Sequence, residues 1–152
     1  SHAGALAIIC CAVYFVLYAG AVSLIEARTF QPLIFVYVML RSVSGLSIVC
    51  LKLAKNPGLA ATFSDGASKK VIRVWLSVYL ILCAGVMCWL NLALGVLCAG
   101  VVLLVFLYFR HMVYRYFGGI NGDMAGWFLQ VAELCVMIAT AVLTLLKGGT
   151  LW

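Results

Sequence analysis

The longest uncharged stretch of the sequence runs from Val74 to Phe109: VWLSVYLILCAGVMCWLNLALGVLCAGVVLLVFLYF. Its 36 residues are too many for one helix across a bilayer, because the hydrocarbon core is spanned by about 20 residues. A division near Asn91 gives two segments of about 18 residues, each about 27 Å long at the rise of an α-helix. This length just crosses the core, so the stretch predicts two membrane-spanning helices joined by a short turn.

Three further apolar segments have the length of a spanning helix. Residues 3–25 carry no charge, residues 29–51 carry only Arg41, and residues 124–146 carry only Glu133. These segments are continuously apolar and lack the alternation of membrane-spanning strands. We therefore predict an all-α, polytopic transmembrane bundle of about five helices, with residues 1–152 forming a single membrane domain.

The composition supports this class of protein. Hydrophobic residues make up 67% of the chain and charged residues 9%, whereas a soluble domain has about half and a quarter. These values exclude an ordinary water-soluble globule, a disordered chain and a nucleic-acid-binding domain, although the net charge is +6. The seven cysteines include no Cys-x-x-Cys pair, and most lie in apolar segments, so we expect buried free thiols.

The basic residues predict how the chain is oriented. Seven of the ten lie in two long connections, residues 52–73 and 110–123. Positive charges gather on the cytoplasmic side of membrane proteins, so both connections and His2 should be cytoplasmic.

One loop stands out by its glycines. The segment Gly118-Gly119-Ile120-Asn121-Gly122-Asp123 directly precedes the last predicted helix. Glycines let backbone N–H groups approach an anion closely, and a helix N-terminus favours negative charge. Asp123 has two interpretations: it caps the helix, or it holds Mg²⁺ beside a bound phosphate.

Four other residues are candidates for chemistry. Arg41 and Glu133 lie inside predicted helices, where a charge is costly and should face protein or water. They could pair with each other and hold the bundle together, or Arg41 could contact a phosphate. Asp65 is the one acid in its basic connection, either a solvated turn residue or a site residue. His2 could act as a base, although an interfacial histidine is more often inert.

Four segments along the chain form a recognisable set of motifs: Ser1–Ala7, Arg41-Ser42, Gly58–Phe63, and Gly118–Asp123 followed by Gly126 and Glu133. In order and spacing they resemble the motifs of one family, the cobalamin synthases (adenosylcobinamide-GDP ribazoletransferases). Asn121 stands where that family usually has Thr, and both side chains can donate a hydrogen bond to a phosphate.

The resemblance implies a location and a reaction. The location would be the cytoplasmic (inner) membrane of a bacterium or archaeon. Adenosylcobinamide-GDP would be joined to α-ribazole or its 5′-phosphate with release of GMP, giving adenosylcobalamin or its 5′-phosphate, with Mg²⁺ as cofactor. The family's acidic metal motif, His-x-Asp-Gly-Leu-x-Asp-x-x-Asp-Gly, is not among these 152 residues. We therefore expect the chain to be the C-terminal part of a longer enzyme and to be inactive alone.

The resemblance also implies a role for each residue. Asp123 would be a metal ligand, Arg41 would contact a phosphate or orient Asp123, and His2 would be a polar contact or a base. Glu133 would support the site. The substrate-binding and phosphate-binding residues would be Gly118, Gly119, Asn121, Gly122 and Asp65.

Three other functions remain open from the sequence. A small transporter or channel subunit would use Arg41 and Glu133 along a substrate path. A non-catalytic scaffold would need none of these residues. A phosphotransferase of the CDP-alcohol kind has an aspartate-rich signature that these residues lack.

Overall fold

The structure is a computed structural model that describes residues 2–54 and 69–148, and within these ranges it contains five long helices. Each is long and apolar enough to cross a membrane, and the described residues form no strand. The predicted all-α, multi-pass bundle is therefore confirmed. The elements are α1 (His2–Ser23), η1 (Ala27–Thr29), α2 (Phe30–Cys50), α4 (Lys69–Leu90), α5 (Leu92–Met112), the π-helical turn η2 (Val113–Phe117) and α6 (Gly122–Leu146).

The long apolar stretch divides where the sequence predicts. Asn91 is the N-cap of α5, and its side-chain oxygen accepts a hydrogen bond from the Leu94 N–H at 3.1 Å. This bond satisfies one of the N–H groups that have no partner within the helix. A residue that favours caps thus ends α4 and begins α5 in the same place.

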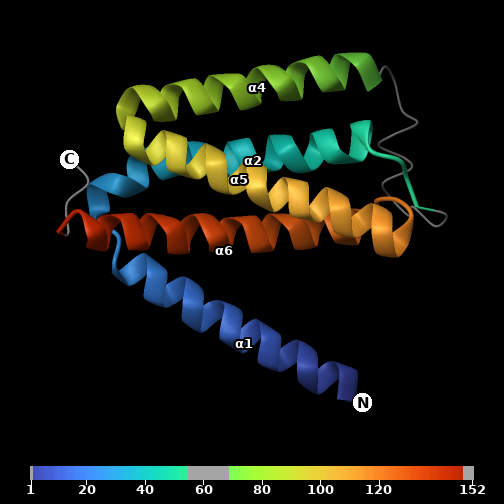
Figure 1. Cartoon of the computed structure of the whole chain (residues 1–152), viewed down its shortest axis with the longest axis horizontal. Helices are drawn as coiled ribbons and strands as arrows, with labels where there is room; N and C mark the ends of the chain where they lie inside the picture. The colour runs from blue at the N-terminus through green and yellow to red at the C-terminus, as the bar shows by residue number, and fades with distance from the viewer. Residues whose placement is uncertain (1, 55–68, 149–152) are drawn as a thin grey trace.

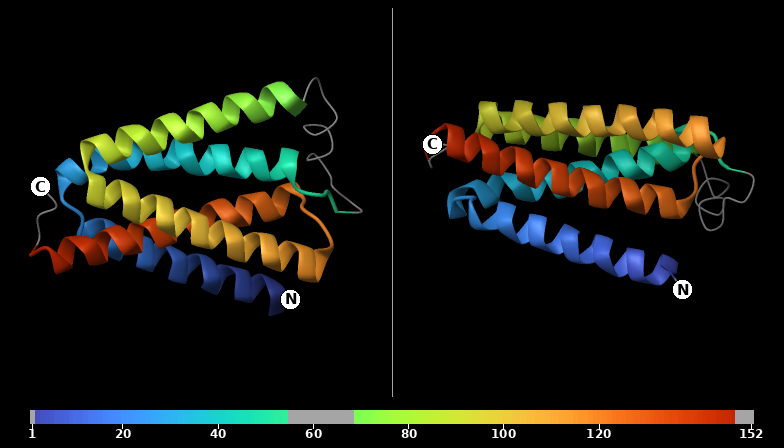
Figure 2. Two further views of the ribbon diagram at one scale, coloured as in Figure 1. Left: turned by 45° about the horizontal axis from the view of Figure 1, so that its top comes forward. Right: turned by 60° about the horizontal axis from the view of Figure 1, so that its bottom comes forward.

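The helices form a bundle with one helix at its side. Helix α2 packs against α4 and α6, and α5 packs against the same two helices. Helix α1 contacts mainly α6 and diverges from it towards its own N-terminal end (Figure 1). Helix α1 begins and α6 ends at opposite ends of the bundle, as an odd number of spanning helices requires (Figures 1 and 2).

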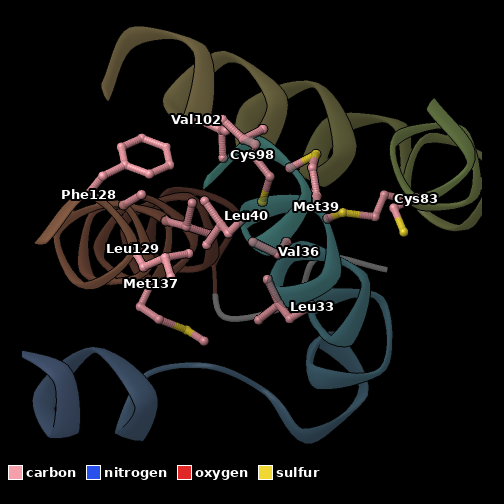
Figure 3. Close-up of a cluster of buried hydrophobic side chains, with 14 of the residues drawn as sticks. Leu33, Val36, Met39, Leu40, Cys83, Cys98, Val102, Phe128, Leu129 and Met137 are labelled. Atoms are coloured by element: carbon pink, nitrogen blue, oxygen red, sulfur yellow. The ribbon is translucent and has the colours of Figure 1, made fainter. Parts of the chain in front are cut away.

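Apolar side chains from α2, α5 and α6 meet in the core. Leu40 of α2 lies near Phe128 of α6 and Cys98 of α5 (Figure 3). The Phe128 ring also lies edge-on to Phe106, with 6.1 Å between ring centroids. Such aromatic pairs add about 1 kcal/mol beyond the area they bury. This packing holds fixed the ends of the three helices, from which the loops described below emerge.

The cysteines follow the packing of their helices. All seven are free, and Cys83 and Cys98 are buried. The expected burial is wrong for Cys10, Cys11 and Cys50, which are exposed. Cys10 and Cys11 lie on α1, most of which packs against nothing in the described structure, and Cys50 is the last residue of α2.

Candidate functional site

The candidate site lies where two loops far apart in sequence pair with each other. One loop follows α2 at Lys52–Ala54, and the other joins η2 to α6. The Ile120 N–H donates to the Lys52 carbonyl at 2.8 Å, and the Ala54 N–H donates to the Ile120 carbonyl at 2.9 Å. Leu53 and Ile120 form an isolated parallel bridge. The Ile120 side chain is fully buried, so this short pairing is anchored in the core.

A tyrosine strengthens the same junction. The backbone N–H of Lys52 donates to the Tyr114 hydroxyl at 3.1 Å. Tyr114 belongs to the π-helical turn η2, which continues α5. The end of α5, the loop after α2 and the start of α6 are therefore linked at one end of the bundle.

Two glycines give the second loop its shape. Gly118 has a φ of 66° and ends the π-helical turn in the left-handed conformation, which a residue with a β-carbon adopts only at a cost. Gly119 is buried against the first loop: a β-carbon there would lie 2.5 Å from the Leu53 carbonyl carbon and 2.6 Å from the Ala54 nitrogen. The two glycines thus let the chain turn out of α5 and then lie flat against the loop after α2.

Asn121, and not Asp123, caps the last helix. The Asn121 side-chain oxygen accepts a hydrogen bond from the Met124 N–H at 2.9 Å. The expectation that Asp123 is the N-cap is therefore wrong. Asn and Asp are equally good caps. The buried pairing ends at Ile120, so the next residue, Asn121, takes the cap position two residues before Asp123. The cap uses only the side-chain oxygen of Asn121, so the side-chain NH₂ group takes no part in capping.

Asp123 is consequently an exposed carboxylate in the first turn of α6. A negative charge there is stabilised by the helix dipole. With Asn121 it lines a cavity of about 420 Å³, whose remaining lining residues are Met112, Phe117, Met124 and Trp127. Gly122 is the first residue of the helix, with open space where a β-carbon would stand. This arrangement offers backbone N–H groups, one carboxylate and an apolar wall to a ligand.

The donor set at this cavity suits part of a magnesium site. Mg²⁺ takes oxygen ligands and is commonly held by one or two carboxylates together with substrate phosphates and water. Asp123 supplies one such carboxylate. The described residues contain no group of three or more His, Cys, Asp or Glu side chains that could hold a metal by themselves.

The loop site and the intramembrane charges lie at different depths. Arg41 is nine residues before the end of α2, about 14 Å from the loops at 1.5 Å per residue. Its side chain is exposed, and no hydrogen bond or ion pair joins it to Asp123 within the described residues. Of the residues predicted for the site, the structure brings together Gly118, Gly119, Asn121, Gly122 and Asp123, but does not bring Arg41 to them.

Arg41 and Glu133 form no ion pair in the described part of the chain, since no nitrogen–oxygen distance within 4.0 Å joins the two side chains. Of the two alternatives for Arg41, direct pairing with Glu133 is therefore not found. Glu133 is partly exposed on α6, so neither charge is enclosed by the helices of this chain.

Sequence reasoning missed the tyrosines that share this region. The hydroxyls of Tyr18 on α1 and Tyr37 on α2 are hydrogen-bonded to each other, and the Tyr14 ring stacks on Tyr18 at 5.9 Å. Tyr37 is four residues from Arg41, and Tyr14 is four from Tyr18, so each pair shares a helix face. This four-residue spacing of polar side chains was the sequence signal that could have predicted a polar contact between α1 and α2.

Two predicted residues cannot be placed. Asp65 lies outside the described residues, and of His2 only the backbone is described, at the start of α1. His2 begins α1 at the same end of the bundle as the paired loops (Figure 1). The proposed roles of these two side chains stay predictions.

Comparison with known proteins gives a consistent result. The profile of a family described as cobalamin-5-phosphate synthase matches residues 1–141. An adenosylcobinamide-GDP ribazoletransferase from Lachnoclostridium phytofermentans is 36% identical over 141 residues, which are 93% of this chain and 54% of that protein. A protein of the same name from Pseudomonas syringae is 29% identical over 126 residues, 83% of this chain and 50% of that protein.

The chain thus spans about half the length of the curated relatives it matches. No solved structure matches it.

Proposed function

Because the chain belongs to the cobalamin-5-phosphate synthase family, we propose that the full-length protein containing it is an adenosylcobinamide-GDP ribazoletransferase. A free ribose hydroxyl of α-ribazole, or of its 5′-phosphate, attacks the phosphorus atom bonded to the cobinamide oxygen. The hydroxyl loses its proton, the phosphorus–oxygen bond to the guanosine phosphate breaks, and GMP leaves. The product is adenosylcobalamin or its 5′-phosphate. The observation that carries the proposal is the exposed Asp123 carboxylate beside the N-terminus of α6, held in place by the paired loops.

Phosphoryl transfer needs positioning and charge stabilisation more than covalent help from the protein. The first N–H groups of α6 have no partner within the helix. Asn121 occupies the N–H of Met124, which leaves those of Gly122 and Asp123 for an anion. Gly118 and Gly122 have open space beside them and would let the backbone approach the pyrophosphate. Gly119, which is buried against the loop after α2, would shape this site without touching the ligand. In this proposal the loop binds and orients the substrate's phosphates at the mouth of the cavity.

Asp123 would hold Mg²⁺ through its carboxylate. The bound ion would neutralise charge on the phosphate oxygens. Asp123 by itself is an incomplete site, so the other ligands would come from substrate, water and further residues of the full-length protein. The amide of Asn121, free from the capping bond, would donate to a phosphate oxygen where relatives of the family have Thr.

The remaining predicted residues have supporting roles in this proposal. Asp65 and His2 would contact substrate from the same cytoplasmic end, where nucleotide substrates are found. Arg41 and Glu133 lie deeper, so they would support the helices rather than contact the phosphates directly. The orientation follows from the basic residues at this end, among them Lys52, Lys69 and Arg110.

The proposal is tested by reconstituting the full-length protein in vesicles with adenosylcobinamide-GDP, α-ribazole and Mg²⁺. We expect GMP to be released in equal amount to the cobalamin formed, and release to stop when the Mg²⁺ is chelated and to resume when it is restored. Movement of a corrinoid across the vesicle membrane without GMP release would contradict the proposal and favour a transporter.

A further inference from the structure

Helix α5 and the π-helical turn η2 that continues it carry an exposed stripe, which is apolar along α5 and basic from Arg110 onwards. At 3.6 residues per turn, the exposed apolar residues of α5 share one face with Arg110 and His111, and Tyr114 and Arg115 of η2 follow. Cys98, Val102 and Phe109 are buried on the opposite face. Leu104 is 68% exposed and Leu107 51% exposed, so the stripe does not face the core. Its members are Val96, Leu103, Leu104, Leu107, Arg110, His111, Tyr114 and Arg115.

The basic part of the stripe surrounds a hollow in the surface. Leu107, Arg110, His111, Tyr114 and Arg115 line a volume of about 530 Å³. Both charged residues in this lining are arginines. The hollow shares no lining residue with the cavity at Asp123, so it is a separate feature on another side of α5.

Aromatic side chains place the hollow at the level of lipid headgroups. Tyr and Trp gather where the hydrocarbon core meets water. Tyr116 is 71% exposed, Tyr108 61% and Trp127 41%, all near the end of the spanning segment Leu92–Phe117. The arginines are therefore at headgroup depth, and Leu107, Leu104 and Leu103 follow at the depth of the acyl chains.

We propose that this hollow binds the headgroup phosphate of an anionic phospholipid, with an acyl chain lying along Leu107, Leu104 and Leu103. Two guanidinium groups suit a phosphate because they form charge-assisted hydrogen bonds, and basic pockets on the cytoplasmic side of helices are suited to lipid headgroups. Orientation alone requires positive charge at this end of the bundle but does not require it on one helix face. The apolar stripe continuing from the hollow favours a lipid over a soluble phosphate.

The test uses the full-length protein in phosphatidylcholine bilayers containing a trace of spin-labelled lipid. The fraction of label immobilised at the protein gives the association constant of phosphatidylglycerol relative to phosphatidylcholine. We expect the wild type to prefer phosphatidylglycerol roughly fivefold, and R110Q/R115Q to bind the two lipids about equally. The charge-retaining R110K/R115K variant should keep most of the preference.

A matched control removes two charges from the same end of a neighbouring helix. Lys69 and Arg73 are exposed on α4, and α4 begins at the end of the bundle where α5 finishes (Figure 1). The K69Q/R73Q variant should retain the lipid preference within about twofold. If K69Q/R73Q lost as much of the phosphatidylglycerol preference as R110Q/R115Q, the preference would come from general surface charge. That result would overturn the proposal.

Two further measurements use the wild type and do not depend on how the variants fold. Photoactivatable phosphatidylglycerol should crosslink to peptides within residues 103–115, and crosslinks confined to α4 would contradict the assignment. Millimolar inorganic phosphate should leave the lipid preference unchanged relative to chloride at equal ionic strength. If phosphate abolished the lipid preference and chloride did not, the hollow would be a site for soluble phosphate. That result would overturn the assignment to a lipid headgroup.

Discussion

Gly119 lies directly against the backbone of Leu53, a residue 66 positions earlier in the chain. A β-carbon on Gly119 would come within 2.5 Å of the Leu53 carbonyl carbon and 2.6 Å of its oxygen. The next residue, Ile120, forms backbone hydrogen bonds with Lys52 and Ala54. This close approach holds the loop after α2 against the loop before α6, and so fixes where the last helix begins.

The G119A variant should therefore be destabilised. The added carbon meets backbone atoms, which cannot move aside as a flexible side chain can, and such overpacking costs about 2 kcal/mol. We expect a lower midpoint of thermal or SDS-induced unfolding. The control is G85A, because the space beside Gly85 on α4 is open. A G119A protein as stable as G85A would contradict the close loop pairing.

The stability of Gly118 variants should depend on how well the new residue tolerates the left-handed conformation. With a φ of 66°, alanine at this position costs about 1 kcal/mol, while asparagine tolerates the conformation better. Nothing lies within 4 Å of a β-carbon there, so crowding does not contribute. Unfolding midpoints should rank wild type above G118N, and G118N above G118A. The opposite order of the two variants would exclude the left-handed turn.

Loss of the Asn121 cap should weaken the start of α6. The N121A variant removes the oxygen that accepts the Met124 N–H, a change that typically costs about 1 kcal/mol. N121S should remain within a few tenths of a kcal/mol of the wild type, because serine is as good a cap. Hydrogen exchange at residues 122–126 measures this directly. Equal protection in N121A and wild type would assign the cap elsewhere.

The tyrosine hydrogen bond should couple α1 to α2. In a double-mutant cycle of Y18F and Y37F, we expect a coupling energy of about 0.6 kcal/mol and at most about 1.7 kcal/mol, the range found for hydrogen bonds between membrane helices. Y79F is the control, since the Tyr79 hydroxyl makes no hydrogen bond with the described residues. Coupling between Y18F and Y79F as large as that between Y18F and Y37F would refute the specific contact.

The helices could be predicted from the sequence because hydrocarbon length and apolar runs decide them. The turn between α4 and α5 could also be predicted, because Asn91 is a polar residue within an apolar stretch and its side chain caps a helix. The pairing of Ile120 with Lys52 and Ala54 could not be predicted, because it uses backbone groups that every residue has. The cap was predicted wrongly at Asp123, because Asn and Asp are equally good caps by residue type and only the buried neighbour Ile120 favours Asn121. Side-chain geometry likewise determined that Arg41 and Glu133 do not meet.

In the proposed site Asp123 serves the phosphoryl transfer and does not cap the helix. The D123N variant of the full-length protein tests this role when GMP release from adenosylcobinamide-GDP and the unfolding midpoint are both measured. We predict that turnover falls by at least about a hundredfold, as for removal of a single electrostatic catalytic group. The unfolding midpoint should fall less than in N121A, because D123N loses only the helix-dipole contribution of about 0.5 kcal/mol. Wild-type turnover in D123N, or an unfolding midpoint lowered as much as in N121A, would contradict a catalytic role for Asp123.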